Sequence, residues 1–187
     1  MTSTILLVII AAIVLYAIYL YNQLVKKRQM SHEGWSGIEV QLKRRADLIP
    51  NLIESVKGYM GHERDTLNEI TELRTKAQSL GEDQVAERAK VEGMLSGALG
   101  RLFALAENYP DLKASQTFLD FQDALEDTEN QIQMARRYYN GTVRDLNVMV
   151  EQFPSNLIAS RFGFTQREFF ELENEADRAV PKVDFGR

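Results

Sequence analysis

The sequence contains no cysteine and only two histidines. Without thiols the chain can form no disulfide bonds, thiol nucleophiles or cysteine-ligated zinc sites. Di-iron helical bundles use Glu-x-x-His pairs, and neither His32 nor His62 has a glutamate three positions earlier. A phosphate-binding Gly-rich loop and a nucleophile elbow are also missing. We therefore predict no catalytic residues, no bound metal and no cofactor, and a protein that is not an enzyme.

Proline is scarce, with 4 residues in 187, and glycine is modest at 11. This composition favours long helices and argues against a fold rich in strands. The formal net charge is −5, so the chain lacks the basic surface that nucleic-acid binding requires. We predict an all-α protein that does not bind nucleic acid.

The first part of the chain, Ile5–Tyr21, carries no charge, glycine or proline. As a helix it would span about 26 Å, close to the hydrocarbon thickness of a bilayer. A cleaved signal peptide is the alternative, but no basic residue precedes the run and no small-residue cleavage site follows it. We predict a short extracytoplasmic N-terminus (residues 1–4), a transmembrane helix (5–21) and a cytoplasmic helical domain (22–187).

The flanks of this run predict its orientation. Basic residues follow the run directly and none precedes it, which places the C-terminal domain in the cytoplasm by the positive-inside rule. We expect a single-pass protein of the bacterial cytoplasmic membrane. Aromatic and basic residues at this end form a predicted membrane interface: Tyr16, Tyr19, Tyr21, Lys26, Lys27 and Arg28. The three cations either attract anionic lipid or only stop transfer, and both roles are compatible.

Apolar residues recur at steps of three and four along most of the remaining chain, which predicts amphipathic helices. We predict three long helices, over about residues 23–78, 84–108 and 112–152, the last with about five heptads of coiled-coil type. Pro50 should kink the first of them. A short helical stretch over 157–162 and a shorter C-terminal helix from Gln166 to about Ala179 should follow. Short loops make neighbouring helices antiparallel, so the expected architecture is an antiparallel bundle.

The second predicted helix carries a stripe of small residues, which share one face at steps of four, four, three and four: Ala89, Gly93, Gly97, Gly100 and Ala104. Three glycines inside a helix cost roughly 2–3 kcal/mol in helix propensity. A close approach to another helix would offset this cost. The stripe predicts helix–helix contact, either inside the domain or between two protomers.

A charged pair is predicted between the first and third long helices. Arg45 falls on the buried stripe of the first helix, and Glu129 lies on the third. If these helices pack antiparallel, the two side chains could form an interior ion pair that fixes the register. The alternative is that both belong to solvated helix faces.

Several blocks in the chain resemble the bacterial LemA family. They include Trp35-Ser36-x-Ile38, Arg44-Arg45-x-Asp47-Leu48-Ile49-Pro50-Asn51-Leu52, Glu107-Asn108-Tyr109-Pro110, Ala135-Arg136-Arg137-x-Tyr139-Asn140 and Phe153-Pro154-Ser155-Asn156. The likeness covers essentially the whole chain in order. It implies an N-terminal anchor, an antiparallel bundle in the cytoplasm, no established enzymatic activity, and genes that often stand beside those of membrane proteases.

These observations favour a non-enzymatic membrane-anchored scaffold or adaptor that self-associates or binds another membrane protein. The expected partners are the lipid bilayer, further copies of the chain, and a membrane protease or other membrane protein. Two alternatives stay open. One is an envelope-stress sensor or adaptor coupled to a membrane protease, and the other is a ligand carrier or hydrolase with an interior pocket.

Overall fold

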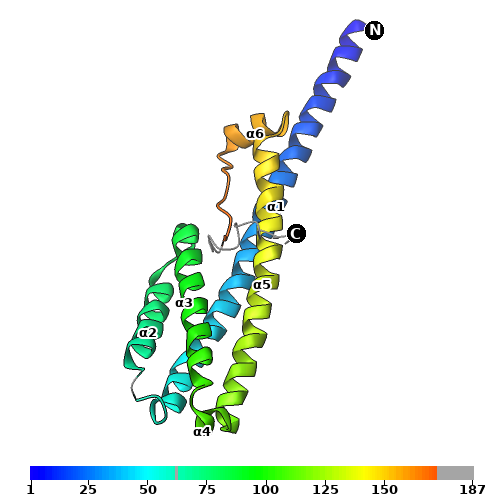
Figure 1. Cartoon of the computed structure of the whole chain (residues 1–187). Coiled ribbons are helices and arrows are strands. Elements are labelled where there is room, and N and C mark those ends of the chain that lie inside the picture. Colours follow the sequence, from blue (N-terminus) through cyan, green and yellow to red (C-terminus); the bar gives the residue numbers. More distant parts are fainter. Residues whose placement is uncertain (62, 172–187) are drawn as a thin grey trace, which may run out of the picture. The chain divides into compact units, whose positions relative to one another are not determined.

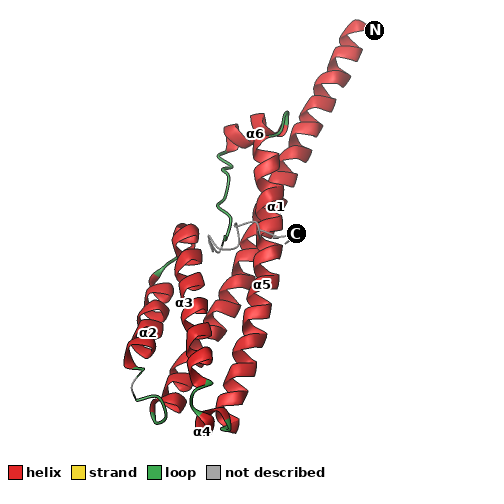
Figure 2. Cartoon of the chain, viewed as in Figure 1, coloured by secondary structure: helices red, strands yellow, loops and turns green. Residues whose placement is uncertain are grey.

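A computed structural model describes residues 1–61 and 63–171 of the chain, and these residues form helices without any strand (Figures 1 and 2). In chain order the helices are α1 (Thr2–Lys57), α2 (Arg64–Ser79), a 3-10 turn η1 (Glu82–Gln84), α3 (Val85–Ala106), α4 (Pro110–Lys113), α5 (Gln116–Glu151) and α6 (Ser155–Phe162). The predicted all-α class is confirmed. The chain divides into two compact units, each of which receives part of α1 and part of α5.

The first unit consists of Met1–Arg45 and Asp127–Phe169. Within it α1 and α5 are antiparallel, because residue numbers rise along α1 while those of their partners fall along α5. Lys27 pairs with Asp145, and Arg45 with Glu129. The buried positions of α1 keep the predicted steps of mostly three and four: Leu24, Ser31, Trp35, Ile38, Leu42 and Arg45. The apolar periodicity therefore predicted the packed faces correctly.

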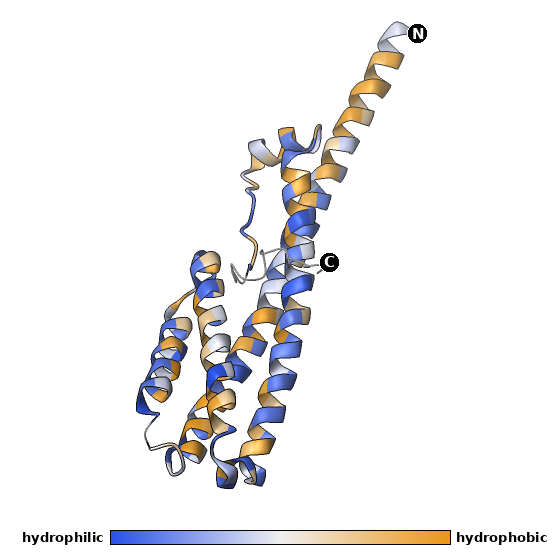
Figure 3. Ribbon diagram, in the orientation of Figure 1, coloured by the Kyte–Doolittle hydropathy of each residue, from blue (hydrophilic) through white to orange (hydrophobic). Residues whose placement is uncertain are grey.

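The start of α1 carries the apolar run, which Figure 3 shows as a continuous hydrophobic stretch. Among the described helices, α1 alone is long and apolar enough to cross a membrane. No helix break separates the run from the packed part of α1, since one helix extends from Thr2 to Lys57. The candidate membrane span therefore continues directly into the packed part of α1.

The second unit consists of Ala46–Glu126 and the end of the chain from Phe170. Its core gathers apolar side chains from α1, α2, α3, α4 and α5: Ile49, Leu52, Val56, Met60, Leu67, Ile70, Leu95, Leu102, Leu112, Phe118 and Leu125 among others. Ion pairs join α2 to α3 on the outside, Arg101 with Glu69 at 2.6 Å and Lys76 with Glu87 at 3.3 Å.

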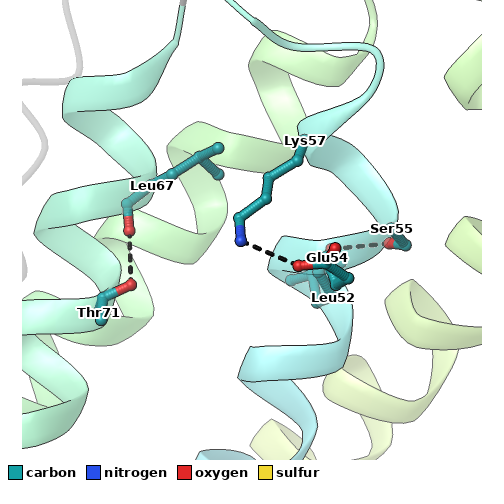
Figure 4. Close-up of polar contacts among 6 residues, drawn as sticks. All are labelled: Leu52, Glu54, Ser55, Lys57, Leu67 and Thr71. Carbon is teal, nitrogen blue, oxygen red and sulfur yellow. Dashed lines mark hydrogen bonds and ion pairs between the residues drawn. The ribbon is translucent and has the colours of Figure 1, made fainter.

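The first long helix ends earlier than predicted. The sequence predicted one helix to about residue 78, but α1 ends at Lys57 and α2 begins at Arg64. Lys57 lies in the last turn, where a cation is favourable near the exposed carbonyls, and its Nζ contacts Glu54 Oε2 at 2.9 Å (Figure 4). The apolar stripe continued across the turn because Met60 is fully buried in the same core as Leu67. The apolar periodicity therefore predicted correctly which residues are buried, but it did not predict the reversal of the chain between α1 and α2.

Pro50 lies inside α1 and cannot donate a hydrogen bond to the carbonyl of Ala46. Arg74 of α2 supplies the missing donor, because its Nε lies 2.6 Å from this carbonyl oxygen. A hydrogen bond from a charged group contributes about 1.5–3 kcal/mol, enough to offset much of the cost of proline in a helix. The helix therefore continues through Pro50 with a side chain from α2 in place of its own backbone N–H.

The helix predicted to begin at Gln166 is absent from residues 164–171, and its remainder lies outside the described residues. Gly163 adopts a left-handed conformation (φ +71°) that ends α6. Beyond it the chain is extended. Asn147 of α5 makes both of its amide hydrogen bonds to the backbone of Arg167, at 2.9 Å each. In the predicted helix the Arg167 carbonyl would have accepted an internal hydrogen bond, whereas here it accepts one from Asn147.

Candidate functional site

The aromatic residues of the predicted membrane interface divide into two groups. Tyr16 and Tyr19 are exposed and stack on each other, with ring centroids 6.4 Å apart. Tyr21 instead meets the edges of Phe162 and Phe164, at 4.9 and 5.7 Å. The first two rings can reach lipid headgroups, whereas the third belongs to an aromatic cluster of the protein itself.

The basic residues of the predicted interface also divide. Lys26 is exposed. Lys27 pairs with Asp145 of α5 at 2.7 Å, and the guanidinium of Arg28 lies 4.8 Å from the centre of the Phe164 ring. Two of the three cations therefore hold α5 and the chain after α6 against α1, in addition to placing positive charge beside the apolar run.

The extended segment 164–169 acts as a strap across α1 and α5 of the first unit. Besides the two bonds from Asn147, the Tyr139 hydroxyl donates to the Glu168 carbonyl at 2.9 Å. The Arg167 guanidinium donates to the Ser31 hydroxyl of α1 at 3.1 Å. Sequence reasoning missed these contacts, since they join residues far apart in the chain and no local pattern marks them.

Arg45 and Glu129 are brought together within the first unit as an ion pair. The Arg45 side chain is 1% exposed and that of Glu129 is 31% exposed. One position earlier on α1, Arg44 pairs with Asp127 at 3.3 Å, and both of those side chains are 52% exposed. The two pairs have the same chemistry and differ in burial, so only the first requires a charge to leave water.

The backbone of α5 approaches α1 closely at Gly34. A Cβ placed on Gly34 would lie 3.1 Å from Tyr139 Cα and 3.3 Å from Thr142 Oγ1. Next to it the Trp35 and Tyr139 rings meet edge to face, with centroids 5.6 Å apart. Gly37, one turn further on, has no atom within 4 Å of the same position. The lack of a side chain is therefore structurally required at Gly34 and not at Gly37.

Alanine substitutions at these two glycines are expected to have opposite effects on stability. Gly34→Ala should lower the free energy of unfolding of the first unit by about 1–3 kcal/mol, because backbone atoms cannot move aside cheaply. Gly37→Ala should raise it by about 0.5–1 kcal/mol through helix propensity. Denaturant titration of the full chain, followed by the fluorescence of its single tryptophan, measures both changes. Equal effects at both positions would contradict the close approach.

The small-residue stripe of α3 is mostly open in the second unit. Ala89 is fully buried and Gly93 partly buried, whereas Gly97, Gly100 and Ala104 are exposed. A Cβ on Gly100 would meet no atom within 4 Å, and one on Gly97 would meet only the tip of Arg101, at 4.0 Å. Contact inside the domain does not account for these two glycines.

Groups suited to metal binding do not gather in the described part of the chain. In residues 1–61 and 63–171, no three histidine, aspartate or glutamate side chains are placed to hold a metal ion. Ion pairs and hydrogen bonds join helices within each unit, among them Lys27 with Asp145, Arg101 with Glu69, and Arg74 with the Ala46 carbonyl. This arrangement can fix helix register and orientation.

An apolar helix of membrane-spanning length that runs without a break into a helical bundle defines the chain as a membrane-associated helical protein. The sequence profile of the LemA family matches residues 34–185. The chain belongs to the LemA family.

Proteins from three bacteria are similar to this chain in sequence. A protein named LemA from Metamycoplasma hominis is 28% identical over 140 residues, which cover 75% of this chain and 64% of the relative. A magnetosome protein named MamQ 2 from Paramagnetospirillum magneticum is 23% identical over 184 residues, 86% of this chain and 68% of the relative. Its counterpart MamQ from Magnetospirillum gryphiswaldense is 22% identical with the same coverage. None of these names describes an enzymatic activity.

Proposed function

We propose that this protein is a non-enzymatic, membrane-anchored scaffold whose second unit binds a further copy of the chain through α3. The observation that carries the proposal is the open glycine face of α3, formed by Gly97, Gly100 and Ala104. Two exposed glycines in the middle of a helix cost roughly 1–2 kcal/mol in propensity. A helix of another protomer packed against the backbone at this face would offset that cost.

The anchor supports the same proposal. A chain that crosses the membrane is confined to two dimensions, which raises its effective concentration toward its neighbours. Because α1 is one helix from Thr2 to Lys57, the orientation of the span is passed on to the first unit. A rigidly oriented domain loses less freedom when it associates than one on a flexible tether.

We also propose that the short N-terminus lies outside the cytoplasmic membrane and that the bundle lies in the cytoplasm. Lys26, Lys27 and Arg28 follow the apolar run, and no lysine or arginine precedes it. The partners of Lys27 and Arg28 in the folded protein do not alter this count, since topology is set by the charges beside the span.

The test of the scaffold proposal is Gly100→Leu in the full chain. Leucine is the better helix former by up to about 1 kcal/mol, so the second unit should remain folded. We expect the variant to lose self-association, measured by light scattering in detergent and by crosslinking of an Ala104→Cys reporter in vesicles. The chain has no other cysteine, so the reporter is unambiguous.

Gly37→Leu is the matched control, because Gly37 is also an exposed helical glycine with no neighbouring atom within 4 Å. It should associate like the wild type. A wild-type chain that stays monomeric at membrane-like concentrations would refute self-association, and a Gly100→Leu variant that associates normally would refute the α3 face.

A further inference from the structure

The end of the first unit that contains α6 exposes large apolar side chains. Phe153 in the turn after α5 is 73% exposed, and Leu157 and Phe162 of α6 are 59% and 57% exposed. We refer to these three residues as the α6 apolar surface. Arg161 lies one turn after Leu157 and is also exposed, whereas Ser155 and Ala159 are buried. Leu157 and Arg161 therefore share the exposed face of α6, whereas Phe162 lies about 140° further round the helix from Leu157, toward the packed side.

The position of α6 along α1 is fixed by its buried contacts. Leu24, Ala159 and Phe164 form one buried cluster, against which Val25 and Ile158 also pack. The Tyr21 ring meets Phe162 at 4.9 Å. Leu20 is buried, although every residue before it in the apolar run is exposed or nearly so. The helix α6 thus lies beside the last residues of the apolar run, where a span of this length leaves the hydrocarbon.

We propose that the α6 apolar surface inserts into the lipid headgroup region and forms a second membrane contact beside the span. Exposed phenylalanine and leucine side chains gathered at one end of a helical unit, with an arginine beside them, are the groups that enter the boundary between headgroups and acyl chains. Arg161 can meet lipid phosphates at that depth. The proposal rests on the membrane anchor of α1, because that helix sets the depth of α6.

The second contact has a mechanical consequence. A single helix can tilt and rotate in a bilayer, and packing or interfacial anchors restrict that freedom. The α6 surface lies to one side of α1, so its insertion fixes the rotation of α1 about its own axis. The first unit would then face the membrane in one defined orientation.

Depth measurements on the full chain test this inference. The Leu157→Cys variant is labelled with a fluorophore whose emission depends on its exposure to water. The labelled protein is then reconstituted into vesicles of phosphatidylcholine and phosphatidylglycerol. We expect quenching by lipids spin-labelled near the headgroup, and access to aqueous iodide reduced on the order of tenfold relative to Val40→Cys. Val40 is the matched control, since it is also apolar and exposed but lies 19 residues beyond Tyr21, about 28 Å along the helix.

An additional label at Ile10→Cys separates the possible failures. If the Ile10 label is shielded while the Leu157 label behaves like the Val40 label, the anchor stands and the second contact is refuted. If the Ile10 label is not shielded, the anchor is refuted and the second contact with it. Shielding at Leu157 that disappears when the protein is diluted into excess lipid would identify another copy of the chain as the occupant and would also refute the lipid contact.

Discussion

Replacing Glu129 with alanine is expected to destabilise the first unit by about 2–3 kcal/mol. The substitution leaves the Arg45 guanidinium, which is 1% exposed, without the carboxylate that faces it. Removal of one partner from a fully buried pair costs about 3–5 kcal/mol, and the partial exposure of Glu129 reduces this figure. The single tryptophan, Trp35, is buried in the same unit and reports its unfolding in a denaturant titration.

Asp127→Ala provides the control for this prediction. Asp127 pairs with Arg44, but both side chains are about half exposed, so its loss should change the free energy of unfolding by less than about 0.5 kcal/mol. The double substitution Arg45→Met with Glu129→Leu should recover most of the stability, because it removes both charges and keeps the volume. If Glu129→Ala lowered the free energy of unfolding no more than Asp127→Ala does, the buried charge of Arg45 would not depend on Glu129 for its stability, and the prediction would be wrong.

The packed face of each helix, and the presence of a charge on that of α1, follow from information that is local in the sequence. Apolar steps of three and four identify one face of each helix, and the position of Arg45 on that face places a charge at the helix contact. The relative direction does not follow from the predicted helices, because three helices joined by short loops would place the first and the third parallel. The predicted first helix divides into α1 and α2, and this additional reversal makes α1 and α5 antiparallel. Once the direction is known, the facing residues on α5 are restricted to a few positions, of which Glu129 carries the opposite charge.

The contacts around α6 and the strap could not be predicted in this way. The Thr165-x-x-Glu168 spacing is that of a helical capping box, and it predicted a helix from Gln166. Instead, Tyr139 and Asn147 bind the backbone at 167 and 168, and those side chains are separated from it by 20 to 29 positions. A local propensity worth a fraction of a kcal/mol per residue does not outweigh several hydrogen bonds from a packed helix.

The glycines show that spacing along a helix does not predict where two backbones come close. The regular stripe on α3 predicted close backbone approach, whereas no regular spacing of small residues marks Gly34. In the structure Gly34 is the position of close approach, whereas Gly97 and Gly100 have open space around them. Spacing identifies glycines that share a helix face, but whether another backbone lies against that face depends on the tertiary packing.

Inserting two glycines after Gln29 is expected to release α6 from α1. Each added residue rotates the helix by about 100°, so the insertion turns the N-terminal part of α1 by about 200° relative to the rest. The Leu24 cluster and the contact of Gly34 with Tyr139 lie on either side of the insertion and cannot both be kept. A single reporter, Ala159→Cys, is buried against Leu24 in the parent chain and should react with a maleimide faster by about tenfold or more once α6 opens.

Gln29→Gly with Glu33→Gly is the control for this insertion, because both positions are exposed and the substitutions soften the helix without changing its register. The reporter should stay protected in this variant. Exposure in the insertion variant alone would mean that the rotational register between the span and the bundle holds α6 in place, so that any change in function could be assigned to geometry at the membrane. Protection in both variants would mean that α6 is held independently of the span, and the apolar run would then serve only to attach the protein to the bilayer.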